Sequence, residues 1–218
     1  MRNKFDEQLL QLNHEMIEMG ALCEEVIALS SQALTDGDTA LAAKVAPLDS
    51  EIDNKEREIE NLCLKLLLRQ QPVARDLRQI SAALKMITDM ERIGDQAEDI
   101  AEIVAFLDGR QAESDALLKE MAKAVIQMVT ESVDAYVKCD IMLAKKVIAA
   151  DDVVDEQFAR VKQSLIGKIA ADPADGEYAL DLLMIAKYYE RIGDHATNIA
   201  EWVIYSVTGT HKDEITLT

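Results

Sequence analysis

Hydrophobic residues recur along the chain at the three- and four-residue spacing of amphipathic helices. The same pattern predicts a first helix over about 5–34, a second helical stretch over about 39–69 and a third helix over about 74–107. The clearest apolar stripe belongs to the third helix and consists of Leu77, Ile80, Leu84, Ile87 and Ile93. The hydrophobic pattern therefore predicts an all-α fold.

Turn-forming residues separate these helical segments. Asp36-Gly37-Asp38 predicts a turn and a helix N-cap before the second stretch. Gln70-Gln71-Pro72 predicts the next turn. Pro47 lies inside the second stretch, and because proline cannot donate an interior helical hydrogen bond, we expect a break or kink there.

An internal repeat organises the whole chain. The pentapeptide Glu-Arg-Ile-Gly-Asp occurs at 91–95 and again at 190–194, 99 residues later, and Ile-Ala-Glu follows both copies. Upstream, acidic and apolar residues repeat at an offset of 102, and turns are expected again near 138–140 and 172–173. We therefore predict two tandem, pseudo-symmetric three-helix bundles over residues 1–108 and 115–210, joined by a linker.

Composition agrees with helices and limits the partners. Only eight Gly and three Pro occur in 218 residues, while 49% of the residues are hydrophobic and 4% aromatic, so the core is aliphatic. The net charge of −18 argues against nucleic acid, because Lys and Arg must displace counterions from its phosphates. An acidic surface suits cations, basic partners or plain solubility.

Three cysteines and the absence of long apolar runs indicate where the protein works. Cys23, Cys63 and Cys139 are widely spaced without a Cys-x-x-Cys pair, which is typical of a reducing compartment. The first residues show no apolar export signal, and the apolar run 62–68 is too short to span a bilayer. We expect a cytoplasmic protein that does not insert into the membrane.

Acidic pairs four residues apart recur at matching places in both halves. This spacing puts two carboxylates on one helix face. The pairs on the second and third helices are equally far from the turn between them, so antiparallel packing would bring them to the same height. We expect four carboxylates to converge in each bundle: Asp49, Asp53, Glu91 and Asp95 in the first, and Asp151, Asp155, Glu190 and Asp194 in the second.

Such clusters need compensation, since two carboxylates about 5 Å apart repel by roughly 3 kcal/mol. Protons or bound cations would supply it, and an all-oxygen donor set suits Mg²⁺, Mn²⁺, Fe or Ca²⁺, with Zn²⁺ a further option. Alternatively, the acids lie on a solvated face and pair with Arg92, Arg191 and nearby lysines. Four further residues of the third helices would widen a metal site, namely Asp99, Glu102, Asn198 and Glu201.

A glycine precedes the last carboxylate of each cluster, although an interior helical glycine costs about 1 kcal/mol against alanine. Close approach of a neighbouring helix or a metal would explain Gly94 and Gly193, and inheritance from the duplicated ancestor is the alternative. His195 adjoins Asp194 but points about 100° away around the helix, so we expect it to be a surface or partly buried histidine.

The sequence resembles the PhoU family of phosphate-specific transport accessory proteins over almost its whole length. The resemblance rests on the doubled Glu-Arg-Ile-Gly-Asp with its Ile-Ala-Glu, the run from Arg69 through Pro72 to Arg78, and the run from Asp38 to Asp49. It implies two three-helix bundles with metal on the eight carboxylates named above. It also implies a negative regulator that links the ATPase of the phosphate ABC transporter to a membrane sensor histidine kinase. We further expect a homodimer.

Two other classes of function remain open from the residues alone. A di-iron carboxylate enzyme would use Glu-x-x-His motifs, yet no Glu here has a His three residues later. Walker A, Gly-x-Ser-x-Gly and His-Glu-x-x-His motifs are also absent. A metal-binding helical scaffold without regulatory function is the other alternative. We expect no catalytic residues.

Overall fold

The computed structural model describes residues 2–70, 72–107 and 116–210. Within these ranges the chain is almost entirely helical and contains no strand, so the all-α prediction is confirmed. The elements in chain order are α1 (Arg2–Asp36), α2 (Thr39–Ala42), α3 (Val45–Gln70), α4 (Ala74–Phe106), α5 (Ala116–Lys138), α6 (Ile141–Ala171), the 3₁₀ turn η1 (Pro173–Asp175) and α7 (Gly176–Thr208).

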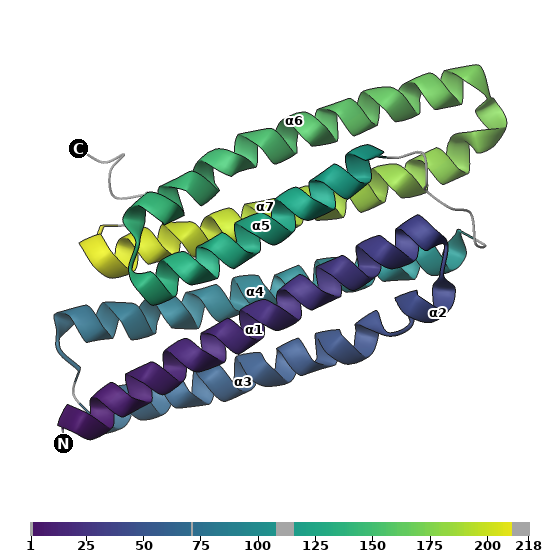
Figure 1. The fold of residues 1–218 in the computed structure, drawn as a ribbon. Coiled ribbons are helices and arrows are strands. Elements are labelled where there is room, and N and C mark those ends of the chain that lie inside the picture. The colour runs from purple at the N-terminus through teal and green to yellow at the C-terminus, as the bar shows by residue number, and fades with distance from the viewer. Residues whose placement is uncertain (1, 71, 108–115, 211–218) are drawn as a thin grey trace.

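The helices form two elongated three-helix bundles that lie side by side (Figure 1). Helices α1, α3 and α4 make the first bundle, and α5, α6 and α7 make the second. The tandem-bundle prediction is thus confirmed. The predicted linker and the exact domain boundaries lie at residues 108–115, outside the described part of the chain. Within the described ranges, no helix is both long and apolar enough to cross a membrane.

The second helical stretch is interrupted, but not where we expected. The break falls at Ala43 and Lys44, and Pro47 becomes the third residue of α3. A proline ring clashes with the carbonyl four residues earlier, which here belongs to Ala43, so the chain leaves the helix before the proline. In the first turn of α3 the missing N–H has no cost. In the second repeat Ala149 takes this place and α6 is continuous.

The core is aliphatic, as the composition indicated. Ile80, Ile87 and Ile93 of the predicted stripe are buried, and Leu84 packs partly against them. Leu77 was wrongly included in the stripe, because 45% of its surface is exposed near the end of the α3–α4 hairpin. The apolar pattern of the third helix therefore extends beyond the residues that pack in the core.

Helices α4 and α7 run antiparallel along the seam between the bundles (Figure 1). Asp89 Oδ1 accepts a hydrogen bond from Asn198 Nδ2 at 3.1 Å and lies 2.9 Å from His195 Nδ1. Further along the seam, Asp99 is hydrogen-bonded to Tyr188. Asp89 corresponds to Tyr188 in the repeat, and Asp99 corresponds to Asn198, so the two contacts are related by the internal pseudo-twofold axis.

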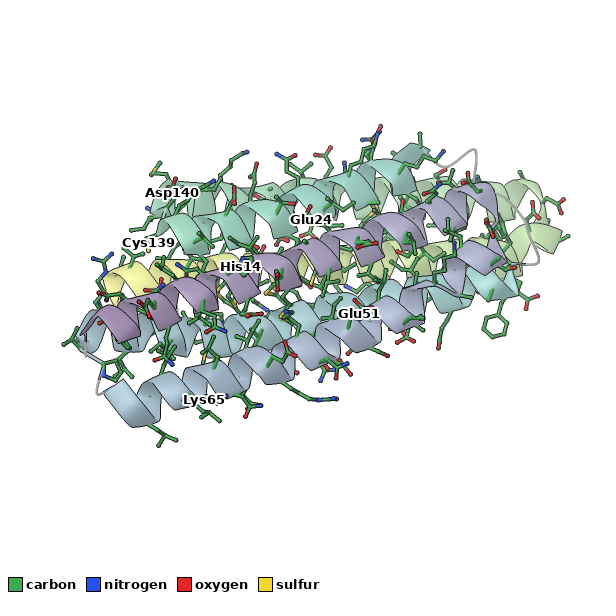
Figure 2. The ribbon with its side chains drawn as sticks, turned by 60° about the horizontal axis from the view of Figure 1, so that its bottom comes forward. His14, Glu24, Glu51, Lys65, Cys139 and Asp140 are labelled. Atoms are coloured by element: carbon green, nitrogen blue, oxygen red, sulfur yellow. The ribbon has the colours of Figure 1, made fainter. Side chains whose placement is uncertain are left out.

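The turn between the first two helices of each repeat uses the same geometry twice. Gly37 and Cys139 occupy equivalent places, and both have a left-handed backbone, with φ of 63° and 52°. The next residues, Asp38 and Asp140, cap the following helices by accepting hydrogen bonds from two backbone N–H groups each. Figure 2 labels Cys139 and Asp140 at the end of the second bundle.

Because a residue with a Cβ is strained in this left-handed conformation, replacing Cys139 with glycine should stabilise the fold. We expect Cys139→Gly to raise the free energy of unfolding by about 1 kcal/mol. Urea denaturation followed by circular dichroism measures this. Cys139→Ala is the control, since it keeps the strain, and equal stability of the two variants would contradict the expectation.

Candidate carboxylate sites

The α3–α4 hairpin brings the four predicted carboxylates of the first repeat into one electrostatic environment. Asp49 and Asp53 come from α3, and Glu91 and Asp95 come from α4. Asp49 experiences the charges of the other three and also that of Glu98. The second repeat is similar, since Asp151, Asp155, Glu190 and Asp194 influence one another between α6 and α7. The common height deduced from the turns therefore agrees with the structure.

Asp49 is the most deeply placed of these carboxylates. Only 8% of its surface is exposed, and its Oδ1 atom is buried without a hydrogen-bond partner. Burial, followed by the charges of Glu98, Asp53, Asp95 and Glu91, raises the pKa of Asp49 to about 7. A buried, unpartnered carboxylate oxygen is costly and calls for a proton or a cation.

Gly94 provides the space that Asp49 occupies. A Cβ atom at position 94 would lie 2.5 Å from Asp49 Oδ1 and 3.1 Å from Ile52 Cδ1. Only glycine lets the carboxylate rest directly on helix α4, so close approach explains Gly94 better than inheritance does. At Gly193 a Cβ would lie 3.5 Å from Asp151 Oδ1, which is ordinary contact. Inheritance is sufficient to explain this second glycine.

Three other carboxylates of the clusters also resist ionisation. Burial raises the pKa of Glu91, with the Asp95 charge as the next cause. Burial likewise raises the pKa of Asp151, assisted by Asp194, and the pKa of Asp194, assisted by Glu190. Each cluster therefore carries negative charge that its protein surroundings do not balance.

In the described part of the chain, basic side chains pair with cluster members other than Asp49 and Asp151. Arg92 Nη1 lies 2.7 Å from Asp95 Oδ2, and its Nε lies 3.4 Å from Glu91 Oε2. Arg57 lies 3.6 Å from Asp53, and in the second repeat Lys187 pairs with Glu190. These pairs partly bear out the alternative of solvated acids. Exposed pairs of this kind contribute about 1 kcal/mol or less, and none of them reaches Asp49 Oδ1.

The donor set fits a hard cation, although the side chains do not converge on one point in this structure. In the described ranges, no three His, Cys, Asp or Glu side chains are close enough to hold a metal ion. The orphaned oxygen of Asp49 and its glycine cradle nevertheless suit an oxygen-coordinated ion. Asp49, Asp53, Glu91 and Asp95 would hold it in the first bundle, after rotation of the more exposed side chains.

The four additional candidate ligands are distributed differently. Asp99 and Asn198 face the seam, where they contact Tyr188 and Asp89. Glu102 is exposed beside Glu98, and Glu201 is partly buried at the equivalent place in α7. His195, expected at or near the surface, is partly buried in the same seam.

Sequence reasoning missed Glu98, which is hydrogen-bonded to Asp49. Its position three residues after Asp95 places both on one face of α4, and this spacing was a usable signal. The repeat obscures it, because the equivalent residue of α7 is Thr197, so this acid is absent from the pattern that the two halves share. Burial raises the pKa of Glu98, and the charge of Glu102 adds to this.

Comparison with known proteins identifies the family. The PhoU domain model matches residues 16–104 and 118–203, one match for each bundle. The chain belongs to the PhoU family. A PhoU homolog of Clostridium acetobutylicum, described as a phosphate-specific transport system accessory protein, is 36% identical over 97% of this chain and 98% of its own length. The Pseudomonas aeruginosa homolog, with the same description, is 35% identical over 99% and 90%.

Crystal structures of PhoU proteins share this architecture. PhoU from Pseudomonas aeruginosa superposes with a TM-score of 0.88 at 35% identity, over 94% of this chain and all of that one. The regulatory protein PhoU of the phosphate transport system from Streptococcus pneumoniae gives a TM-score of 0.86 at 26% identity, over 95% and 98%. The tandem bundle is therefore the PhoU fold over 94–95% of the chain.

The two glycines should respond oppositely to alanine. Gly94→Ala forces its Cβ against Asp49 and Ile52, and we expect a loss of about 1–3 kcal/mol of unfolding free energy. Gly193→Ala meets only ordinary contacts and gains helix propensity, so we expect a stabilisation of up to about 1 kcal/mol. Urea denaturation in the presence of a chelator compares the two, and equal effects would disprove the cradle at Gly94.

The raised pKa of Asp49 predicts the pH dependence of stability. Asp49 keeps its proton up to about pH 7 in the folded chain, whereas an unfolded aspartate ionises near about 4. Between these values the folded state binds more protons, so the unfolding free energy falls as the pH rises. We expect the metal-free protein to lose stability as the pH rises from about 4 to about 7.

Asp49→Asn should flatten this dependence, because the amide does not titrate. Denaturation at several pH values, in a chelator, measures the slope for the wild type and the variant. Asp38→Asn is the control, since Asp38 caps α2 outside the cluster. Identical slopes for the wild type and Asp49→Asn would show that Asp49 ionises normally.

Proposed function

We propose that this PhoU-family chain acts in the phosphate-specific transport system as a negative regulator of phosphate uptake and of the phosphate-starvation response. The observation that carries the proposal is the match of both bundles and nearly the whole chain to PhoU proteins. The relatives at 35–36% identity are described as accessory proteins of that system. The proposed role is that of an adaptor in the cytoplasm, without a catalytic step.

The adaptor would connect the ATPase of the phosphate ABC transporter to a membrane sensor histidine kinase. The net charge of −18 supports binding to basic partner surfaces and predicts salt-sensitive encounter. Two similar bundles in one chain offer two similar faces, which suits a protein that links two partners. The chain would act as a homodimer.

The carboxylate clusters would make this adaptor dependent on metal. A divalent or trivalent cation, with Mg²⁺, Mn²⁺ and Fe as the leading choices, would balance the buried charge around Asp49 and its equivalent Asp151. Because the ion binds only where the hairpin is folded, it would stabilise the bundle by mass action. Metal would thereby set the spacing of α3 against α4 and of α6 against α7.

Complementation of a strain that lacks its own PhoU protein tests the regulatory role. In phosphate-rich medium, a reporter of a phosphate-starvation gene should be active in the empty strain and repressed by the wild-type chain. The variant with alanine at Glu91, Asp95, Glu190 and Asp194 should fail to repress, because both clusters lose their ExxxD half. Immunoblotting confirms that the variant accumulates.

The matched control removes the same amount of charge elsewhere. Glu25, Glu60, Glu120 and Glu156 are exposed helical glutamates outside the clusters, and their alanine variant should still repress. No repression by the wild-type chain in a strain complete except for PhoU would refute the proposed function. Repression by the quadruple cluster variant would leave the regulator in place and refute its dependence on metal.

A further inference from the structure

The two carboxylate sites differ in the residue behind their deepest aspartate. In the first bundle that residue is Glu98, and its carboxyl group is hydrogen-bonded to Asp49. In the second bundle the equivalent residue is Thr197, a neutral side chain whose hydroxyl is buried without a hydrogen-bond partner. A threonine brings no charge to the aspartate, whereas a second carboxylate adds negative charge at the same place.

The first site is also the more enclosed one. Asp49 is buried and the three other carboxylates of its cluster are partly buried. In the second cluster Asp155 and Asp194 are exposed, and Asp151 is only partly buried. A charge surrounded by protein is screened less by water, so each additional carboxylate has a larger effect in the first bundle.

In the first bundle, the break before Pro47 lies beside a cleft that includes Glu98 in its lining. A cleft of about 190 Å³ is lined by alanines of α3 and α4, by residues at the α2–α3 break, and by Glu98 and Glu102. The alanines at the break include Ala43 and Ala46. In the continuous helix α6 the equivalent residues are Lys145 and Ile148, and Ile148 packs against the core.

At their outer ends, too, the first cluster carries more negative charge than the second. Thr88 of α4 donates a hydrogen bond to Glu56 at 3.3 Å, so a further carboxylate lies beside Glu91. The equivalents of Thr88 and Glu56 are Lys187 and Phe158, and the Lys187 ammonium lies 5.7 Å from the Phe158 ring centre. Lys187 pairs with Glu190 and so brings a positive charge into the second site.

We infer that the two metal sites of this chain are unequal, with Glu98 as an additional ligand that makes the first site the tighter one. The inference rests on the proposed metal dependence and adds which site fills first. Six carboxylates contribute to the first cluster, namely Asp49, Asp53, Glu56, Glu91, Asp95 and Glu98. Four contribute to the second. There Thr197 takes the place of the acid Glu98, and Lys187 takes the place of the neutral Thr88. Affinity of oxygen sites for divalent cations rises with ligand charge.

Isothermal titration of the metal-free, full-length protein with Mn²⁺ tests the order of filling. The wild type should show two classes of site. Asp95→Asn should abolish the tighter class, and Asp194→Asn should abolish the weaker one. The opposite assignment would overturn the inference, and so would two classes of equal affinity.

Reciprocal exchange of the two discriminating residues tests the role of Glu98. Glu98→Thr should weaken the tighter class by about 10- to 100-fold, and Thr197→Glu should strengthen the weaker class. Glu25→Thr is the matched control on the exposed surface and should change neither class. Circular dichroism and electron paramagnetic resonance of bound Mn²⁺ separate loss of a ligand from loss of folding.

These outcomes separate the inference about Glu98 from the proposed metal dependence on which it rests. Unchanged affinity in Glu98→Thr, with Mn²⁺ still bound, would refute the role of Glu98 and leave the metal-dependent regulator standing. Absence of Mn²⁺ binding by the wild-type protein would refute both. Weakening of both classes by Glu98→Thr would show coupling between the bundles and would overturn the assignment of Glu98 to one site.

Discussion

Repulsion among carboxylates that are held between two packed helices is the constraint on which the architecture depends. The first hairpin buries Asp49 and the second partly buries Asp151, and the other acids lie around these two aspartates. The apolar cores on either side hold the helices together and prevent this charge from dispersing into water. The first hairpin thus packs closely at Gly94, directly beside carboxylates whose charges oppose one another.

Around the ExxxD motif, α4 and α7 each make two separate sets of contacts, one on each of two neighbouring helix faces. One face carries Gly94 or Gly193 and the ExxxD carboxylates toward α3 or α6. The neighbouring face carries the seam residues, including His195 directly after Asp194. A change in the position of α7 at its carboxylates would therefore be felt at the contact between the bundles, because a helix moves as a rigid body.

Much of the fold and part of the site could be predicted from the sequence. The doubled pentapeptide and the equal distances from the proline turns indicated two hairpins with level carboxylates, because helical rise is regular. To predict where the helix breaks before Pro47, one must know which carbonyl group the proline ring would clash with. Glu98 was missed because it has no acidic counterpart, and the exposure of Leu77 does not follow from the spacing of apolar residues along its helix. Each of these depends on tertiary neighbours, which a one-dimensional pattern does not record.

The seam between the bundles has the symmetry of a homodimer interface, yet it lies within one polypeptide. In a true dimer, each substitution appears twice, so Asp89 and Tyr188 could not differ. Fusion of the two copies removes that restriction, and the seam now holds Asp89 with Asn198 at one place and Asp99 with Tyr188 at the other. A duplicated ancestor thereby gained freedom to specialise its halves separately, while the covalent connection kept both at a fixed ratio of one to one.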